Sequence, residues 1–129
     1  MNRRALLRPI TSLSVLALAV GMLAVPADSH AVLVRSTPTA RAVLRRPPDR
    51  VQLWFNERLE PAFSTATVWS ASGAQVDRQD VRVGPDDSKR LSVTLPALDP
   101  GIYTVRFRVL SVDGHIVAAS FPFTVKTKP

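Results

Sequence analysis

The sequence predicts an all-β fold, a seven-stranded Greek-key β-sandwich or barrel in a single domain. Two observations support this prediction. Apolar and polar residues alternate along several segments, which places one face of each strand on a core and the other toward water. Turn-forming Pro, Gly and Asp residues separate these segments, and no stretch after residue 30 shows the apolar stripe of a capped helix.

Alternation defines four strands, at residues 51–56, 91–95, 103–110 and 121–126. Three further strands are expected at 32–36, 65–71 and 75–83, and the basic, Pro-rich segment 41–50 is expected to be a loop. Pro122 lies inside the last strand and has no N–H for a ladder hydrogen bond. This strand is therefore expected to be an edge strand or to contain a bulge.

The first 29 residues have the three parts of a secretory signal peptide. Three arginines precede an apolar run without charge (10–25), and small residues follow at Ala27 and Ser29. The run is shorter than the ~20 residues that span a bilayer, which favours a signal peptide over a membrane anchor. We predict a signal peptide over 1–29, cleavage near the bond between Ser29 and His30, and a mature domain over 30–129. The mature protein would be exported, to the periplasm, the cell envelope or the exterior, by the Sec or the twin-arginine route.

The composition excludes several classes of function. The chain has 17 Lys+Arg against 10 Asp+Glu, but the basic residues are scattered rather than grouped with aromatics or on a recognition helix. This pattern indicates a solvated basic surface, so no nucleic-acid partner is expected. Cysteine is absent, so any metal must be bound through nitrogen and oxygen. We expect a monomer.

Two histidines, His30 and His115, are the residues most able to bind a metal. After cleavage, the α-amine and the imidazole of His30 can chelate one ion, because an α-amine with a pKa near ~8 loses its proton to a metal at neutral pH. Asp113 and His115 are two residues apart, so both can point to one face, and Gly114 permits a tight turn between them. A nitrogen-rich, nearly planar ligand set of this kind suits Cu(II).

Each of these residues also has an interpretation without a metal. Asp113-Gly114 between two alternating runs is a strong hairpin signal. His115 is equally consistent with a solvated loop histidine, and His30 with an accident of the cleavage region. From the residues alone, metal binding and a plain β-sandwich interaction module both remain open.

Five segments resemble the CopC-like copper-binding proteins of bacteria: HAVLVRSTP (30–38), VQLWFNE (51–57), GIYTV (101–105), RVLSVDGH (108–115) and SFPFTV (120–125). The resemblance implies a cupredoxin-like or immunoglobulin-like β-sandwich. It also implies a Cu(II) site formed by the mature N-terminal amine and imidazole of His30 with Asp113 and His115. Glu57 matches a glutamate that lies near the metal in some members.

Some members of that family bind a second ion, Cu(I), in a methionine-rich loop. The only methionines here are Met1 and Met22, both in the predicted signal peptide, so no Cu(I) site is expected.

The resemblance further implies a non-enzymatic copper carrier or buffer that sequesters copper or delivers it to a CopD-type membrane copper transporter. The resemblance fits copper resistance and copper uptake alike. A histidine-brace copper monooxygenase is the enzymatic alternative. The short chain and a copper position occupied by Asp113 disfavour it.

Overall fold

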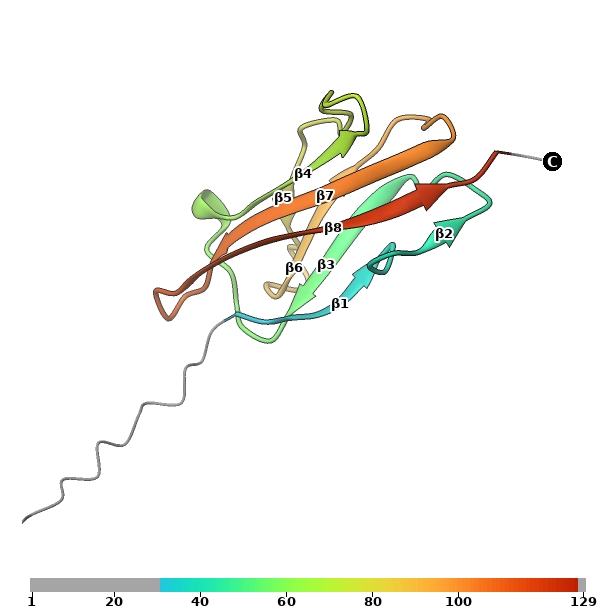
Figure 1. Cartoon of the computed structure of the whole chain (residues 1–129). Coiled ribbons are helices and arrows are strands. Elements are labelled where there is room, and N and C mark those ends of the chain that lie inside the picture. The colour runs from blue at the N-terminus through green and yellow to red at the C-terminus, as the bar shows by residue number, and fades with distance from the viewer. Residues whose placement is uncertain (1–30, 128–129) are drawn as a thin grey trace, which may run out of the picture.

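The computed structural model describes residues 31–127, which form two four-stranded β-sheets packed face to face (Figure 1). Sheet A has the order β1-β3-β6-β5 and sheet B the order β2-β8-β7-β4. The strands of sheet A are β1 (Leu33–Thr37), β3 (Arg50–Phe55), β6 (Arg90–Thr94) and β5 (Arg82–Val83). Those of sheet B are β2 (Val43–Leu44), β8 (Ile116–Val125), β7 (Gly101–Leu110) and β4 (Thr65–Ser70). A short 3₁₀ helix, η1 (Pro61–Phe63), precedes β4.

The connections confirm the predicted Greek-key sandwich. Only the β5–β6 and β7–β8 connections stay within one sheet, and the chain otherwise crosses between sheets. The order β1-β3-β6-β5 facing β4-β7-β8 corresponds to the ABED and CFG sheets of an immunoglobulin constant-type domain. The eighth strand, β2, forms within the segment 41–50 that was expected to be a loop. It pairs in parallel with the end of β8, where the N–H of Thr124 donates to the carbonyl of Ala42 at 2.8 Å.

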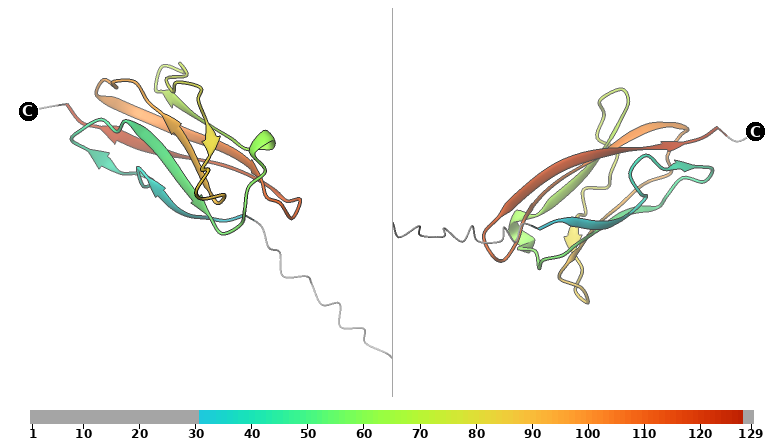
Figure 2. Two further views of the ribbon diagram at one scale, coloured as in Figure 1. Left: turned by 180° about the vertical axis from the view of Figure 1, so that it is seen from behind. Right: turned by 60° about the horizontal axis from the view of Figure 1, so that its bottom comes forward.

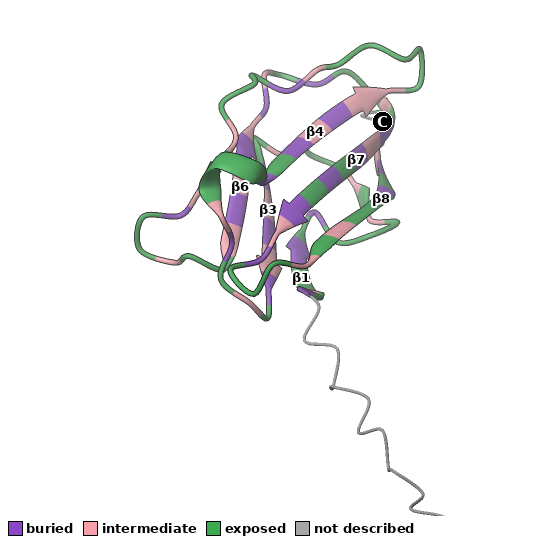
Figure 3. Ribbon diagram, turned by 90° about the vertical axis from the view of Figure 1, so that its left-hand side faces the viewer, coloured by how far each residue is buried: buried purple, intermediate pink, exposed green. Residues whose placement is uncertain are grey.

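The alternation in the sequence corresponds to the observed burial (Figure 3). Every second residue of β3, β6, β7 and the second half of β8 is buried between the sheets. Phe55 meets Phe107 edge-on, and Tyr103 stacks on Phe123, each with ring centroids 5.5 Å apart. Aromatic pairs in these geometries stabilise a core beyond their buried area. The inner faces of the two sheets therefore form one continuous core.

Tyr103 also fixes the β6–β7 connection to the sandwich. Its hydroxyl donates to the backbone carbonyl of Asp99, 2.5 Å away and four residues upstream. This arrangement corresponds to the tyrosine corner of immunoglobulin-like domains, at the equivalent strand. Burial and the nearby Asp99 carboxylate raise the pKa of Tyr103, so the phenol stays protonated and remains a donor.

Two expectations about strands were wrong. Residues 75–83 do not form one strand: a single bridge joins Gln75 to Trp69, and pairing resumes only at β5. Between them, the buried carboxylate of Asp77 accepts from the N–H groups of Val68 (2.8 Å) and Gln79 (2.9 Å). The carboxylate of Asp77 thus accepts from backbone N–H groups that a neighbouring strand would otherwise bind. The alternation of apolar and polar residues gives no sign of such a contact.

Pro122 was expected to mark an edge strand or a bulge, but β8 lies between β2 and β7 and its register with β7 is unbroken. The carbonyl of Pro122 accepts from the N–H of Arg41 at 2.7 Å, so the polar groups of Pro122 face away from β7. Pairing with β2 begins only at Thr124, so the missing N–H interrupts neither ladder.

Three sequence-based expectations lie outside the described residues: the signal peptide over 1–29, its cleavage site and the placement of His30. Within 31–127 there is no helix of the length and apolar character needed to cross a bilayer.

Candidate metal centre

The β7–β8 turn, residues 111–115, contains the two described residues of the predicted metal site. The N–H of Ser111 donates to the carbonyl of His115 (3.0 Å), and the N–H of Gly114 donates to the carbonyl of Ser111 (2.9 Å). Gly114 has φ +92°, a left-handed conformation that residues other than glycine rarely adopt. The Asp-Gly hairpin signal was therefore correct, and it coexists with the arrangement expected of a metal site.

The turn brings the side chains of Asp113 and His115 together. Nδ1 of His115 lies 3.2 Å from Oδ2 of Asp113, while Oδ1 of Asp113 accepts from the backbone N–H of His115 at 3.3 Å. Oδ1 also accepts a hydrogen bond from the hydroxyl of Ser111, whose side chain is fully buried. The buried hydroxyl of Ser111 therefore orients the carboxylate of Asp113.

The separation of the pair fits both an ion pair and two ligands of one metal ion. Two ligands at about 2 Å from one ion, in adjacent positions, lie about 2.8–3 Å apart, close to the observed 3.2 Å. The side chains of His115 and Asp113 are 43% and 26% exposed, although Nδ1 of His115 is itself buried against Asp113. Ser111 supplies the outer-shell hydrogen bond that commonly orients a ligating carboxylate.

The segment that follows β3 holds this turn in place. The N–H of Val112 donates to the carbonyl of Arg58 at 2.9 Å, and the N–H of Glu60 donates to the carbonyl of Leu110 at 2.8 Å. A bridge joins Leu59, which is buried, to Ser111. The turn is therefore attached to the core rather than free at the tip of a hairpin.

The beginning of the described chain lies at the same end of the sandwich as this turn (Figures 1 and 2). Ala31 is buried, and residues 31–33 line one groove together with residues 116–121 of β8. The N–H of Val32 donates to Oδ1 of Asn56 at 2.6 Å, and the N–H of Asn56 donates back to the carbonyl of Val32 at 3.1 Å. Ala31 and Ile116, the residues that follow His30 and His115, therefore line the same groove.

Glu57 is half-buried in the loop after β3, next to the segment that holds the turn. Within residues 31–127, no three His, Cys, Asp or Glu side chains are grouped closely enough to bind a metal ion. The structure therefore unites Asp113 with His115 but does not add Glu57 to them.

Sequence reasoning gave no role to two residues that shape the site. Ser111 lies two residues before Asp113 in the segment RVLSVDGH, just as Asp113 lies two residues before His115. This spacing was the one sign in the sequence that Ser111 could contact Asp113. Asn56 lies inside another of these segments, VQLWFNE (51–57), but no local spacing predicts its contact with Val32, which joins residues 24 positions apart in the sequence.

Comparison with known proteins gives a consistent result. The model of the CopC domain matches residues 33–126. Protein YobA of Escherichia coli K12 is 34% identical over 99 residues, which are 76% of this chain and 80% of that protein. Copper transport protein CutJ of Bacillus subtilis is 30% identical over 98 residues, 75% of this chain but only 18% of that longer protein.

Two solved structures share the fold. CopC from Methylosinus trichosporium OB3b aligns with a TM-score of 0.70 and 36% identity, over 75% of this chain and 94% of that one. PcoC, a methionine-rich copper resistance protein from Escherichia coli, aligns with a TM-score of 0.66 and 31% identity, over 75% of this chain and 99% of that one. The match to the domain model covers most of the chain and agrees with the sandwich and its turn, so this chain belongs to the CopC family.

Proposed function

We propose that the mature chain, starting at His30, binds one Cu(II) outside the cytoplasm and acts as a copper carrier or buffer rather than as an enzyme. The ligands would be the α-amine and imidazole of His30, the carboxylate of Asp113 and the imidazole of His115. Signal-peptide cleavage would create the amine ligand, so binding would begin only after export.

One observation carries this proposal. Asp113 and His115 lie 3.2 Å apart at the end of the sandwich where the described chain begins, one residue after His30. The hydrogen bonds between Val32 and Asn56 fix that beginning, so the mature N-terminus would start within reach of the pair. An amine, two imidazoles and a carboxylate are ligands that suit Cu(II).

The oxidation state follows from the ligands that the sequence provides. PcoC, a structural relative, is methionine-rich, whereas this chain has no methionine after Met22 and no cysteine. Cu(I) selects thioether and thiolate sulfur. The mature chain would therefore bind Cu(II) without a second, Cu(I) site.

The chain's relatives support a role in copper handling. In CutJ the matching domain accounts for about a fifth of a longer protein that is named for copper transport. By analogy, this chain would sequester copper or deliver it to a CopD-type membrane transporter.

Titration of the mature chain with Cu(II), followed by EPR, tests the proposal. We expect one equivalent bound with nitrogen hyperfine structure, and affinity that falls on acidification because protons compete with the metal for its ligands. Asp113→Ala and His115→Ala should each weaken binding at least tenfold. Asp99→Ala, which removes a carboxylate from the β6–β7 connection, should leave binding unchanged. Wild-type affinity in His115→Ala would rule out this site.

A further inference from the structure

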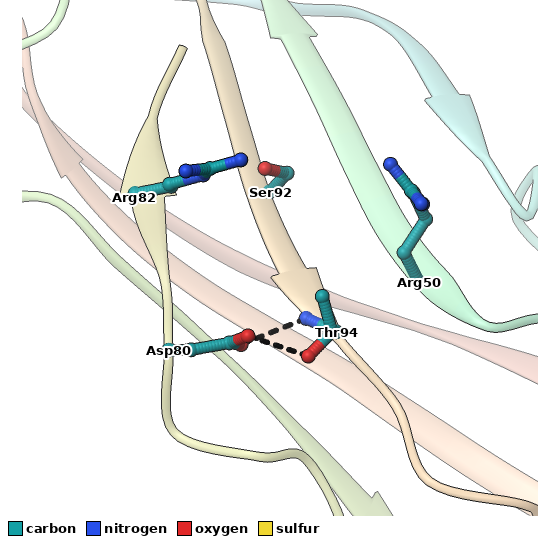
Figure 4. Close-up of a pocket in the computed structure, with 5 residues that line it drawn as sticks. All are labelled: Arg50, Asp80, Arg82, Ser92 and Thr94. Atoms are coloured by element: carbon teal, nitrogen blue, oxygen red, sulfur yellow. Dashed lines mark hydrogen bonds between the residues drawn. The ribbon is translucent and has the colours of Figure 1, made fainter. Parts of the chain in front are cut away.

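A shallow hollow on the outer face of sheet A lies away from the proposed copper site. Its volume is about 250 Å³, and five residues of β3, β6, β5 and the segment before β5 line it (Figure 4): Arg50, Asp80, Arg82, Ser92 and Thr94. Arg82 is the direct cross-strand partner of Ser92, and Arg50 that of Thr94. Two arginines and two hydroxyls therefore share one opening.

The single acid in the hollow, Asp80, is already compensated. Its carboxylate accepts from the N–H of Thr94 at 2.9 Å and from the hydroxyl of Thr94 at 2.5 Å. These bonds, together with the positive charge of Arg78, hold the pKa of Asp80 below its usual value. Figure 4 shows this carboxylate directed at Thr94, while the side chains of Arg82 and Arg50 lie on either side of Ser92.

The two arginines are not compensated in the same way. Within residues 31–127 Arg82 makes no ion pair; its charge helps to lower the pKa of the nearby Asp86 from a longer distance, but that carboxylate is bound by Arg90 at 2.6 Å. Among the described residues, the side chain of Arg50 makes one ion pair, from Nε to its neighbour Asp49 at 3.4 Å, with both side chains largely exposed, so its terminal nitrogens remain available. An exposed pair of this kind contributes little binding energy.

We propose that Arg50, Arg82 and Ser92 form a binding site for a phosphate group. A guanidinium presents a planar fork of donors that matches the oxygens of phosphate, and a serine hydroxyl can donate a further hydrogen bond. Ser92 on β6 is the diagonal neighbour of Arg50 on β3. Such neighbours are about 7–8 Å apart, a distance that the long side chain of Arg50 can span. The site is independent of copper.

The phosphate could belong to a free ion or to a lipid headgroup. The same face of sheet A presents a further cation farther along β3: the guanidinium of Arg35 lies 3.9 Å from the ring centroid of Trp54. Trp54 pairs with Arg35 on one side and with Arg90 on the other. Exposed arginines of this kind can add long-range attraction to an anionic membrane surface.

A titration of the metal-free mature chain with inorganic phosphate, at constant ionic strength, tests the site by ¹H–¹⁵N NMR. We expect saturable shifts centred on residues 82 and 92. The double change Arg50→Gln and Arg82→Gln should weaken binding at least tenfold. A control with Arg106→Gln and Arg108→Gln, which also removes two charges but from the outer face of sheet B, should change it less than twofold. Equal effects of both variants, or shifts spread over the whole surface, would mean only diffuse positive charge and would overturn the proposal.

A second pair of variants tests the role assigned to Asp80. Asp80→Asn removes the negative charge next to the two arginines and should strengthen phosphate binding severalfold. Asp99→Asn removes the same charge elsewhere and should not. No gain in Asp80→Asn over Asp99→Asn would contradict the site.

Vesicles distinguish the two sources of phosphate. Selective co-sedimentation with phosphatidylglycerol over phosphatidylcholine, lost in the double variant, would identify the headgroup as the ligand. Phosphate binding without this selectivity would identify the free ion. Cu(II) affinity should be unchanged in the double variant, so failure of this site and failure of the copper proposal are separable.

Discussion

Ser111 is the buried residue that orients the proposed copper ligands of the β7–β8 turn. Its hydroxyl donates to Asp113, and its backbone joins the turn to the carbonyl of His115. Ser111→Ala should lower Cu(II) affinity by about tenfold, because outer-shell partners of metal ligands commonly contribute 10–100-fold. Competition with a chelator of known affinity measures the change.

The control for Ser111→Ala is Ser92→Ala, which removes a hydroxyl from the outer face of sheet A and should leave Cu(II) affinity unchanged. If Ser111→Ala binds copper like the wild type while both variants remain folded, Asp113 does not need this orientation.

At the residue scale, the sequence identifies contacts that are local. Asp113 and His115 lie two positions apart, so one turn decides whether they meet, and Asp-Gly predicts that turn. Asn56 and Val32 are joined only by the tertiary fold, so no spacing indicates their hydrogen bonds. Glu57 is of the same kind: its match to a family position does not determine where its side chain lies.

At the scale of single elements, Asp77 replaces a missing strand partner. Its buried carboxylate accepts from the backbone of Val68 in β4 and of Gln79 in the following loop. Asp77→Ala would leave these N–H groups without an acceptor, and we expect the free energy of unfolding to fall by about 2–3 kcal/mol. Urea denaturation followed by tryptophan fluorescence measures this loss.

Two further variants separate charge from hydrogen bonding at this position. Asp77→Asn retains one carbonyl acceptor and should cost less than Asp77→Ala. Asp49→Ala removes an exposed carboxylate and should stay within about 0.5 kcal/mol of the wild type. Equal stability of Asp77→Ala and Asp49→Ala would show that the loop does not depend on Asp77.

The long strands could be predicted from the sequence, but the short ones could not. In β3, β6, β7 and β8 each inner residue is buried in a common core, so burial imposes the period of two. The two-residue strands β2 and β5 are too short to show a period. They are defined by the partner they pair with, which is β8 for one and β6 for the other.

At the scale of the whole molecule, the sandwich brings together two distant parts of the chain. Strand β1 lies in sheet A and the β7–β8 turn in sheet B, yet the start of β1 and the turn lie at the same end of the sandwich (Figures 1 and 2). The crossing connections of a Greek key bring these two parts of the chain to one end. The fold class was predictable from the sequence, but only the resemblance indicated that the start of β1 and the turn lie at the same end.

Cleavage at His30 should control copper binding through this end of the molecule. The described chain starts at Ala31, which is buried, and Val32 is fixed to Asn56, so the segment cannot slide to place another residue near the turn. A chain with one extra alanine before His30 retains every side chain but converts the α-amine of His30 into a peptide N–H, which can bind Cu(II) only after it loses a much less acidic proton. We expect its Cu(II) affinity to be at least a hundredfold lower than that of the chain that starts at His30.

The comparison uses chains with and without the extra alanine, each with wild-type His115 and with His115→Ala. If the amine and His115 bind the same ion, His115→Ala should cost much less in the extended chain than in the processed chain, because the chelate is already lost. Equal affinity of the two wild-type N-termini would contradict the role of the amine. Fully additive losses would show that the amine and His115 bind separate ions.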